Sequence, residues 1–311
     1  MKAIEVKNLQ KSYNGQPAVQ GVDFAAERGQ IVGLLGPNGA GKSTIISILA
    51  GILPPDGGEA FIKGYSVTDD PEEAKAHLGV VPQDIALYPD LSARENLVFW
   101  GKMYGLRGAV LQSRVDDVLE MVGLVSRQGD RVSKFSGGMK RRLNIGAALL
   151  HKPDVLIMDE PTVGIDPQSR RHILEQVKAL NNQGMVILLT THRMEEAAEL
   201  ATHIAIIDFG KIIAFDTQNK LIKLVGERTR IDLVLDGEVE PFVDAWRSVD
   251  GISRITLSGN KITVLVKESN RALAHLFEAA SQANVRISSF GIQEPNLETV
   301  FLHLTGRALR D

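Results

Sequence analysis

Nine consecutive residues near the N-terminus have the types and the spacing needed to hold a triphosphate. The segment reads Gly36-Pro37-Asn38-Gly39-Ala40-Gly41-Lys42-Ser43-Thr44. Its glycines allow the backbone to curl, so that successive N–H groups point inward at phosphate oxygens. Lys42 is then placed to reach the β- and γ-phosphates, and the Ser43 hydroxyl to bind Mg²⁺. A plain glycine-rich turn is the alternative, but this spacing predicts that the chain binds a nucleoside triphosphate.

Two acidic residues that follow an apolar run are the candidates for hydrolytic chemistry. The run Val155–Met158 is apolar throughout, and Asp159 and Glu160 come directly after it. Hydrolysis of a triphosphate needs a bound Mg²⁺ and a base for the attacking water. We expect Asp159 to position the metal together with Ser43, and Glu160 to act as the base. Taken alone, two such acids are also compatible with a solvated strand end.

Polar residues at the ends of other runs can join this site. His192 follows the apolar run Met185–Thr191, and Gln83 comes shortly after Leu78–Val81. Open α/β sheets hold their ligands at the carboxyl ends of parallel strands, so His192 and Gln83 are candidate site residues. A lone strand-end histidine or glutamine is more often structural. Tyr13 can stack on an adenine ring, although a half-buried strand-end tyrosine is the plainer interpretation.

The apolar runs also indicate the framework that positions these residues. Strands are expected over residues 3–9, 19–24, 31–35, 60–64, 78–81, 154–160 and 185–192, with a turn over 11–16 and helices over 45–50 and 168–181. Continuous apolar strands that alternate with helices are typical of an α/β fold built on a buried parallel sheet.

A helical insert is predicted over residues of about 85 to 150, since the apolar spacing changes to that of helices there. Ser92 and Glu95 fit a capping box, and Ser136 is a natural N-cap for the last helix of the insert. The basic run Lys140-Arg141-Arg142 in that helix is interpreted as a solvated face.

A smaller domain is expected over residues 221–311, after a first domain over 1–220. The expected elements are strands over 229–235, 253–257, 262–266 and 285–292, helices over 242–249 and 273–280, a turn at Ser258-Gly259-Asn260, and a closing helix over 297–304. The order strand, helix, strand, strand, helix, strand is the ferredoxin-like arrangement, so this domain is predicted to be α+β.

Composition narrows the class of protein. The chain has 311 residues, a net charge of −3, 44% hydrophobic and 23% charged residues, and no cysteine. This charge gives no reason to expect a nucleic acid partner, and the absence of cysteine excludes disulfides and thiolate metal sites. No apolar run approaches the ~18 residues that span a bilayer, and the N-terminus lacks a signal-peptide pattern. A cytoplasmic location is therefore expected.

Taken in order, these motifs resemble those of the ATP-binding subunits of ABC transporters. The resemblance covers residues 1 to about 220 and rests on Tyr13, the P-loop, Gln83, Ser136-Gly137-Gly138, Asp159-Glu160, Gly164-Ile165-Asp166 and His192. Phe135 and Met139 depart from the family's Leu-Ser-Gly-Gly-Gln signature, and Ile165 from its Gly-Leu-Asp, but the Ser-Gly-Gly backbone is intact. The run Gly137–Arg142, together with the C-terminal run Glu294–Leu302, resembles the multidrug, antibiotic and polysaccharide exporter branch, of daunorubicin-resistance type.

The resemblance implies a P-loop NTPase cassette with a RecA-like core, a β-subdomain and the helical insert, which hydrolyses ATP with Mg²⁺. Tyr13 would stack on the adenine, and His192 and Gln83 would contact the γ-phosphate and the water or metal. Ser136, Gly137, Gly138 and Asp166 would bind nucleotide, the signature residues capping the γ-phosphate held by a second copy in a head-to-tail dimer. Separate transmembrane permease subunits would dock near Gln83–Arg94, which would place the chain peripherally on the cytoplasmic face of the cell membrane. Export is the expected direction.

Two other functions are compatible with parts of the sequence. One is a soluble ATPase of the same superfamily that acts on DNA or ribosomes. Lys42 and Ser136 enclose no sustained heptad pattern, and the chain has one cassette, which disfavours this alternative. The other is ligand sensing through the C-terminal domain, but a fold alone does not establish a function.

Overall fold

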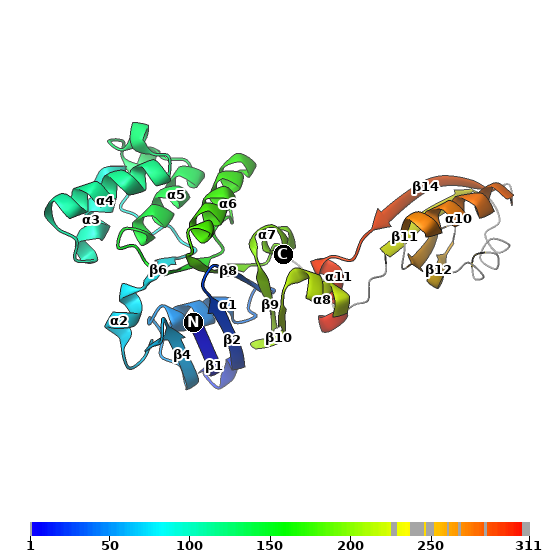
Figure 1. Ribbon diagram of the computed structural model, residues 1–311, viewed down its shortest axis with the longest axis horizontal. Helices are drawn as coiled ribbons and strands as arrows, with labels where there is room; N and C mark the ends of the chain where they lie inside the picture. Colours follow the sequence, from blue (N-terminus) through cyan, green and yellow to red (C-terminus); the bar gives the residue numbers. More distant parts are fainter. Residues whose placement is uncertain are drawn as a thin grey trace. The chain divides into compact units, whose positions relative to one another are not determined.

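The computed structural model describes residues 2–224, 229–236, 246, 252–259, 261–266, 269–282 and 285–306. The chain divides into two compact units, Met1–Gln218 and Asn219–Ala308, which are treated separately below. Figure 1 shows the elements of each unit. None of the helices within the described ranges is both long enough and apolar enough to cross a membrane.

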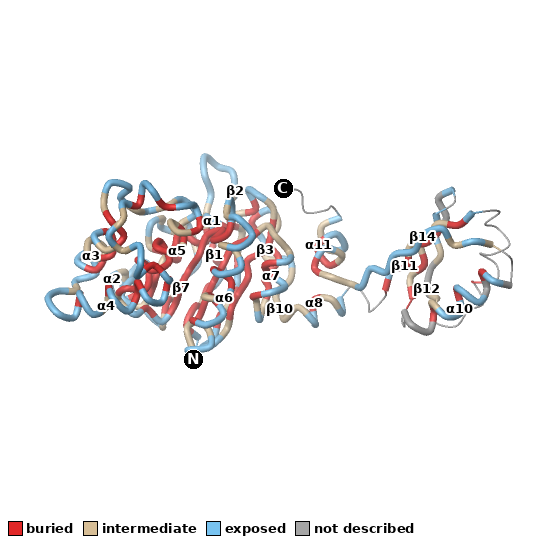
Figure 2. The backbone as a smooth tube through the Cα atoms, turned by 90° about the horizontal axis from the view of Figure 1, so that it is seen from above, coloured by how far each residue is buried: buried red, intermediate tan, exposed pale blue. Residues whose placement is uncertain are grey.

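A six-stranded sheet forms the centre of the first unit, in the order β10-β9-β3-β8-β7-β6. Its strands are β3 (Ile31–Leu35), β6 (Leu78–Val81), β7 (Val155–Asp159), β8 (Val186–Thr191), β9 (His203–Asp208) and β10 (Lys211–Asp216). All neighbours are parallel except β9 and β10. Every residue of β3, β7 and β8 is buried, which confirms the prediction of buried parallel strands. Figure 2 shows the buried centre of this unit in red around the labels β3 and β7. The sequence analysis did not predict β9 and β10.

An antiparallel sheet, in the order β2-β1-β4-β5, packs on one face of the central sheet. Its strands are β1 (Lys2–Tyr13), β2 (Gln16–Glu27), β4 (Gly57–Ile62) and β5 (Tyr65–Ser66). The predicted turn over 11–16 is wrong in its length. Asn14 (φ 50) and Gly15 (φ 80) alone turn the chain, because two left-handed residues make a tight hairpin whose twist matches that of the strands.

Helices complete the two hydrophobic layers of this unit. The face toward the antiparallel sheet also receives α1 (Lys42–Leu49), whereas the other face packs against α5 (Gly137–Ala148), α6 (Pro167–Asn182) and α7 (Met194–Leu200). Alternate residues of β7 supply the two layers, Val155 and Ile157 to the first and Leu156 and Met158 to the second. A short helix, α2 (Pro71–Ala76), was not predicted.

The helical insert has a core of its own. It comprises α3 (Ala93–Met103), α4 (Gly108–Met121), two short 3₁₀ turns (Val125–Arg127 and Val132–Lys134) and one face of α5. The predicted capping box is confirmed, since the Ser92 side chain accepts from Glu95 N and the Glu95 carboxylate accepts from Ser92 N. Ser136 caps α5 as predicted, accepting from Met139 N at 3.2 Å.

The second unit has a four-stranded antiparallel sheet in the order β12-β13-β11-β14. Its elements are α8 (Gln218–Leu224), β11 (Thr229–Asp236), β12 (Ile252–Ser258), β13 (Lys261–Val266), α10 (Ser269–Gln282), β14 (Arg286–Gln293) and α11 (Leu297–Thr305). The predicted helix over 242–249 lies outside the described residues except for Trp246, and Asn260 also lies outside them. The ferredoxin-like class therefore stays a prediction.

Candidate nucleotide-binding and hydrolysis site

The loop between β3 and α1 requires glycine at two points. A Cβ atom on Gly36 would lie 2.2 Å from the carbonyl oxygen of Ile207, at the end of β9. Gly41 has a φ of +101°, and a Cβ there would lie 2.4 Å from the carbonyl oxygen of Ala18 in β2. The loop therefore lies directly against the backbones of β9 and β2, and a side chain at Gly36 or Gly41 would clash with them.

Lys42 is the first residue of α1, and its side chain folds back onto that loop. It is 5% exposed, and its Nζ donates to the carbonyl oxygens of Gly36 (2.8 Å) and Pro37 (3.0 Å). Burial lowers the pKa of Lys42 from its usual value, while the nearby carboxylates of Glu160 and Asp159 oppose that shift. Ser43 is exposed on the first turn of α1. A buried ammonium and an exposed hydroxyl beside curled backbone match a phosphate-binding loop.

Glu160 and His192 meet Lys42 at the carboxyl ends of β7 and β8. Glu160 is 7% exposed, and its Oε1 lies 3.8 Å from Lys42 Nζ and 3.1 Å from His192 Nδ1. Its φ of 45° is unusual for a residue other than glycine, and such backbone strain clusters at active sites. The structure therefore brings these three predicted site residues into direct contact.

Asp159 is held by a residue that the sequence analysis missed. Thr190 is fully buried opposite Asp159 in the β7–β8 register. Its hydroxyl donates to Asp159 Oδ1 and accepts from the backbone N–H of Glu160 at 3.0 Å. One threonine thus fixes both acids. The sequence did offer one sign of this role, because Thr190 is a hydroxyl residue that directly follows the apolar residues Met185–Leu189.

A second buried carboxylate links the segments that follow the two strands. Glu196, 2% exposed in α7, accepts from the hydroxyls of Thr162 and of Thr191, the latter at 3.1 Å. Arg170 Nε of α6 lies 3.1 Å from Glu196 Oε1 as an ion pair, without hydrogen-bond geometry, and Arg193 Nε lies 3.9 Å away. Glu196 was not identified from the sequence.

Gln83 follows β6, which neighbours β7 in the sheet, and its side chain is exposed. Its backbone oxygen accepts from Arg141 Nη2 at 2.5 Å, and that of Pro82 accepts from Arg141 Nη1 at 2.6 Å. Arg141 is 3% exposed, and Arg142 donates to the Val122 carbonyl at 2.8 Å. The interpretation of this basic run as a solvated helix face is therefore wrong for Arg141 and Arg142. Both guanidinium groups instead donate to backbone carbonyls, that of Arg141 just after β6 and that of Arg142 just after α4.

The signature residues form a separate group at the starts of α5 and α6. A Cβ atom on Gly138 would lie 2.1 Å from Ser169 Oγ, so the two helices approach closely there. Asp166 caps α6 by accepting from Ser169 N at 2.9 Å, and this bond lowers the pKa of Asp166. Within the described residues, no hydrogen bond or ion pair joins this group, with Ser136 and Gly137, to the P-loop.

Tyr13 ends β1 and is 47% exposed, more than a half-buried strand-end residue. An exposed ring remains available for stacking.

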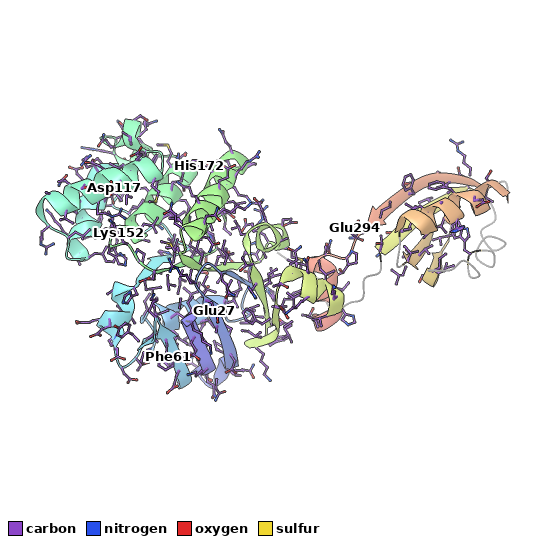
Figure 3. All side chains as sticks on the ribbon, in the orientation of Figure 1. Glu27, Phe61, Asp117, Lys152, His172 and Glu294 are labelled. Carbon is purple, nitrogen blue, oxygen red and sulfur yellow. The ribbon has the colours of Figure 1, made fainter. Side chains whose placement is uncertain are left out.

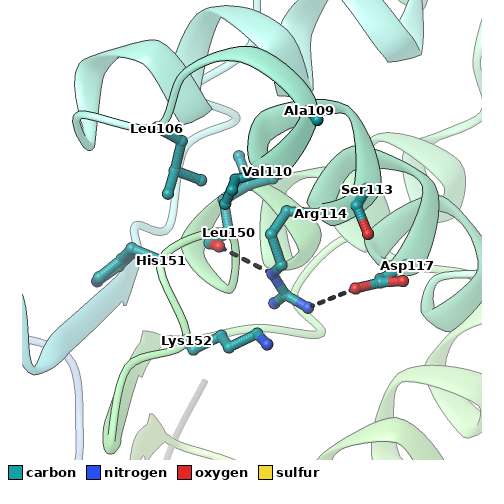
Figure 4. A pocket seen from close by; sticks show the side chains of 9 residues that line it. All are labelled: Leu106, Ala109, Val110, Ser113, Arg114, Asp117, Leu150, His151 and Lys152. Carbon is teal, nitrogen blue, oxygen red and sulfur yellow. Dashed lines mark hydrogen bonds and ion pairs between the residues drawn. The ribbon is translucent and has the colours of Figure 1, made fainter.

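Figure 4 shows a cavity elsewhere, of about 500 Å³, lined by α4 and the segment after α5. Arg114 crosses it, donating to the Leu150 carbonyl at 3.0 Å and pairing with Asp117 at 3.3 Å. None of the predicted site residues lines this cavity.

The residues present fit a magnesium ion that accompanies a triphosphate. Across the described residues, no three histidine or carboxylate groups converge as a metal site of their own. Mg²⁺ is ordinarily held by one or two protein ligands, substrate phosphates and waters. Asp159 and the exposed Ser43 supply such a sparse set.

The fold and the site together define a P-loop nucleoside triphosphatase. The sequence pattern of the ABC transporter family matches residues 19–163. The chain is 48% identical over 310 residues to the linearmycin resistance ATP-binding protein LnrL of Bacillus subtilis (strain 168), covering 99% of this chain and 100% of that one. It is 40% identical to the Nod factor export ATP-binding protein I of Cupriavidus pinatubonensis (strain JMP 134 / LMG 1197), covering 99% and 92%.

Solved structures agree with this result. An ATP-binding subunit of an ABC transporter superposes with a TM-score of 0.66 at 33% identity, covering 72% of this chain and 93% of that one. A dimeric post-hydrolysis ATP-binding cassette with ADP and Pi gives 0.62 at 27% identity, covering 69% and 98%. The chain belongs to the ABC transporter family, as an ATP-binding subunit and an ATPase.

Proposed function

We propose that this chain drives export by closing as a dimer around two ATP–Mg²⁺ and transmitting that closure to separate transmembrane subunits. The convergence of Lys42, Glu160 and His192 at the carboxyl edge of the sheet carries the proposal. Relatives named for antibiotic resistance and Nod factor export match over nearly the whole chain, which supports export as the direction of transport.

Each residue of the site has a chemical task in this proposal. Lys42 exchanges its loop carbonyls for the β- and γ-phosphates, and Glu160 accepts a proton from the attacking water. His192 contacts the γ-phosphate and orients the Glu160 carboxylate, while Gln83 contacts the water or metal. Ser43 and Asp159 would hold Mg²⁺, which would neutralise negative charge on the triphosphate.

The signature group completes the site of a second copy. Ser136, Gly137 and Gly138 begin a helix whose positive end suits a γ-phosphate, and no described bond ties them to the P-loop of their own chain. Asp166 and Tyr13 are assigned to nucleotide binding on the resemblance alone. Two copies arranged head to tail would therefore enclose two nucleotides.

The domain limits and partners follow the same reasoning. We assign residues 1–220 to the ATP-binding domain, about 85–150 to its helical subdomain and 221–311 to the accessory domain. Transmembrane subunits would dock near Gln83–Arg94, on the cytoplasmic face of the cell membrane. A soluble member acting on DNA or ribosomes is not favoured by relatives named for resistance and export.

The test compares the wild type with Glu160→Gln for ATPase rate and for oligomeric state, with and without ATP–Mg²⁺. Loss of the base should lower the rate by about 100- to 10,000-fold. The variant should then accumulate as an ATP-bound dimer. Glu199→Gln is the matched control, because Glu199 is an exposed partner of Lys178. Normal turnover in Glu160→Gln would remove Glu160 as the base, and absence of an ATP-dependent dimer would remove the sandwich.

A further inference from the structure

The ladder between β7 and β8 ends just before the two residues that are proposed to carry out hydrolysis. Its last pair joins Asp159 to Thr190, and Glu160 and His192 lie beyond it. Glu160 also has a left-handed φ of 45°, so its segment leaves the extended conformation of the strand. The regular hydrogen bonds of the sheet therefore do not set the separation of these two segments, and side chains must do so.

One buried carboxylate, that of Glu196 in α7, connects the two segments. It is 2% exposed, and its Oε1 accepts from the hydroxyl of Thr162, which lies two residues after Glu160. Its Oε2 accepts at 3.1 Å from the hydroxyl of Thr191, which directly precedes His192. The two oxygens of a single side chain thus hold the chain next to each of these residues.

The partners of Glu196 are themselves held in place. Thr162 and Thr191 are 1% and 2% exposed, so neither hydroxyl can turn to water instead. The Thr191 hydroxyl also accepts from the backbone N–H of Arg193 at 2.9 Å, which shapes the turn around His192. Buried polar groups whose partners are all present keep a single geometry, because an unpaired alternative costs the full desolvation penalty.

The negative charge of Glu196 is fixed from a third element. Arg170 Nε lies 3.1 Å from Glu196 Oε1 and belongs to α6, the helix on which Figure 3 labels His172. A buried ion pair is weak evidence for a role in stability, because apolar residues of similar volume are often as stabilising. A charged bridge at this edge of the sheet is better explained by the geometry that it imposes.

We propose that Glu196 is a positioning residue for ATP hydrolysis. It acts through Thr162 on the segment of the base and through Thr191 on that of the histidine. The quantity that it sets is the distance from Glu160 Oε1 to His192 Nδ1, which is 3.1 Å. A misplacement of about 1 Å at a reacting group can cost about 100-fold in rate. The inference rests on the proposed function, since it takes Glu160 as the base and His192 as its partner.

Removal of one threonine hydroxyl tests this bridge and leaves the Glu196–Arg170 pair in place. Thr162→Val keeps the volume of the side chain, and kcat for ATP hydrolysis should fall by about 10- to 100-fold. KM and the affinity for a non-hydrolysable ATP analogue should change by less than about twofold, because the bond that is lost leads to α7. Thr162→Ser returns the hydroxyl and should restore most of kcat. Thr191→Val releases the other segment and should show the same split between kcat and KM.

Thr202→Val is the matched control at the opposite edge of the same sheet. Thr202 directly precedes β9, and its hydroxyl donates to the carbonyl oxygen of Ile31 and accepts from the N–H of Ile31, each at 3.0 Å. This variant should lose thermal stability, while kcat at a temperature where it is folded stays within about twofold of that of the wild type. Normal kcat in either Thr162→Val or Thr191→Val, or an equal loss of kcat in Thr202→Val, overturns the proposal.

A double-mutant cycle with Glu160→Gln separates positioning from stability. If Thr162 acts through Glu160, Thr162→Val should change the single-turnover rate by less than about twofold once the base is gone. Equal loss factors in both backgrounds would mean a role independent of Glu160 and would overturn the proposal. Normal hydrolysis by Glu160→Gln alone would overturn the proposed function and this inference with it. A normal Thr162→Val rate beside an inactive Glu160→Gln overturns this inference alone.

Discussion

The two units of this chain are stabilised by different kinds of interior. Most buried polar or charged residues of the first unit lie around the nucleotide site and the strands that end there, Lys42, Asp159, Glu160, Thr190 and Glu196 among them. In the second unit, among the residues that the structure describes, Thr229 alone is both polar and buried. Its core is an apolar layer between one sheet face and α10.

The contrast is between a unit that holds buried charges at its strand ends and a unit whose described interior is apolar. A buried charge costs several kcal/mol of desolvation unless it is paired, so a fold keeps one only where partners or function require it. The first unit keeps several and arranges them at strand ends. The second unit keeps none in its described core, so its described interior is stabilised by apolar contacts.

Removing the charge of Glu196 should give the largest change in stability. Glu196→Gln leaves Arg170 without its ionic partner, and breaking a buried pair costs about 3–5 kcal/mol. We expect the free energy of unfolding of the first unit, measured in urea, to fall by that amount. Glu199→Gln, on the same helix but exposed, should change it by less than about 0.5 kcal/mol. Equal losses of unfolding free energy in the two variants would mean that the buried Glu196–Arg170 pair stabilises the unit no more than the exposed Glu199–Lys178 pair.

Truncating the core of the second unit should produce a loss of another kind. Leu276 is fully buried in α10, so Leu276→Ala should destabilise that unit by about 3 kcal/mol through lost transfer energy and a cavity. The ATPase rate at a permissive temperature should stay unchanged. His275→Ala, exposed on the same helix, is the control. A loss of ATPase activity in Leu276→Ala would show that the two units are energetically coupled.

Thr190 tests whether the acids must be held as well as present. Thr190→Val keeps the volume but removes the bond to Asp159 and the acceptor for Glu160 N–H. Loss of such an outer partner ordinarily costs about 10- to 100-fold in activity. The reduction should appear in kcat, and Thr190→Ser should recover most of it because the hydroxyl returns. A Thr190→Val enzyme with normal kcat would show that the acids hold their positions without it.

The smallest effect is expected from the two helix caps. Asp166 caps α6 and Asn296 caps α11, each accepting the N–H three residues on, at 2.9 and 3.0 Å. Asn296→Ala should cost about 1 kcal/mol at every pH, because an amide does not titrate.

Asp166→Ala should instead depend on pH. The backbone N–H of Ser169 lowers the folded-state pKa of Asp166 below its usual value of 3.8. The stabilisation is therefore complete above that value and is lost as the pH falls through the lowered pKa. Melting curves of both variants at falling pH check this difference. A pH-independent Asp166→Ala effect would show that the carboxylate charge does not matter to the cap.

The sequence was informative where chemistry depends on neighbours along the chain. The P-loop, the Asp159-Glu160 pair and the Ser92–Glu95 box are local patterns, and the structure places the P-loop, the acids and the capping box where they were predicted. Thr190, Arg141 and Glu196 were missed because their partners lie far away in sequence. Strand register sets Thr190 against Asp159, and helix packing sets Arg141 against the Pro82 and Gln83 carbonyls.

The bonds from Lys42 to its own loop have a thermodynamic consequence. Since the ammonium already ties Gly36 and Pro37 together, the loop has little conformational entropy left to lose when a triphosphate enters. The same bonds must be exchanged for phosphate, so part of the new enthalpy is cancelled. The net affinity is therefore lower than the new phosphate contacts alone would give, which suits a subunit that must release its nucleotide in every cycle.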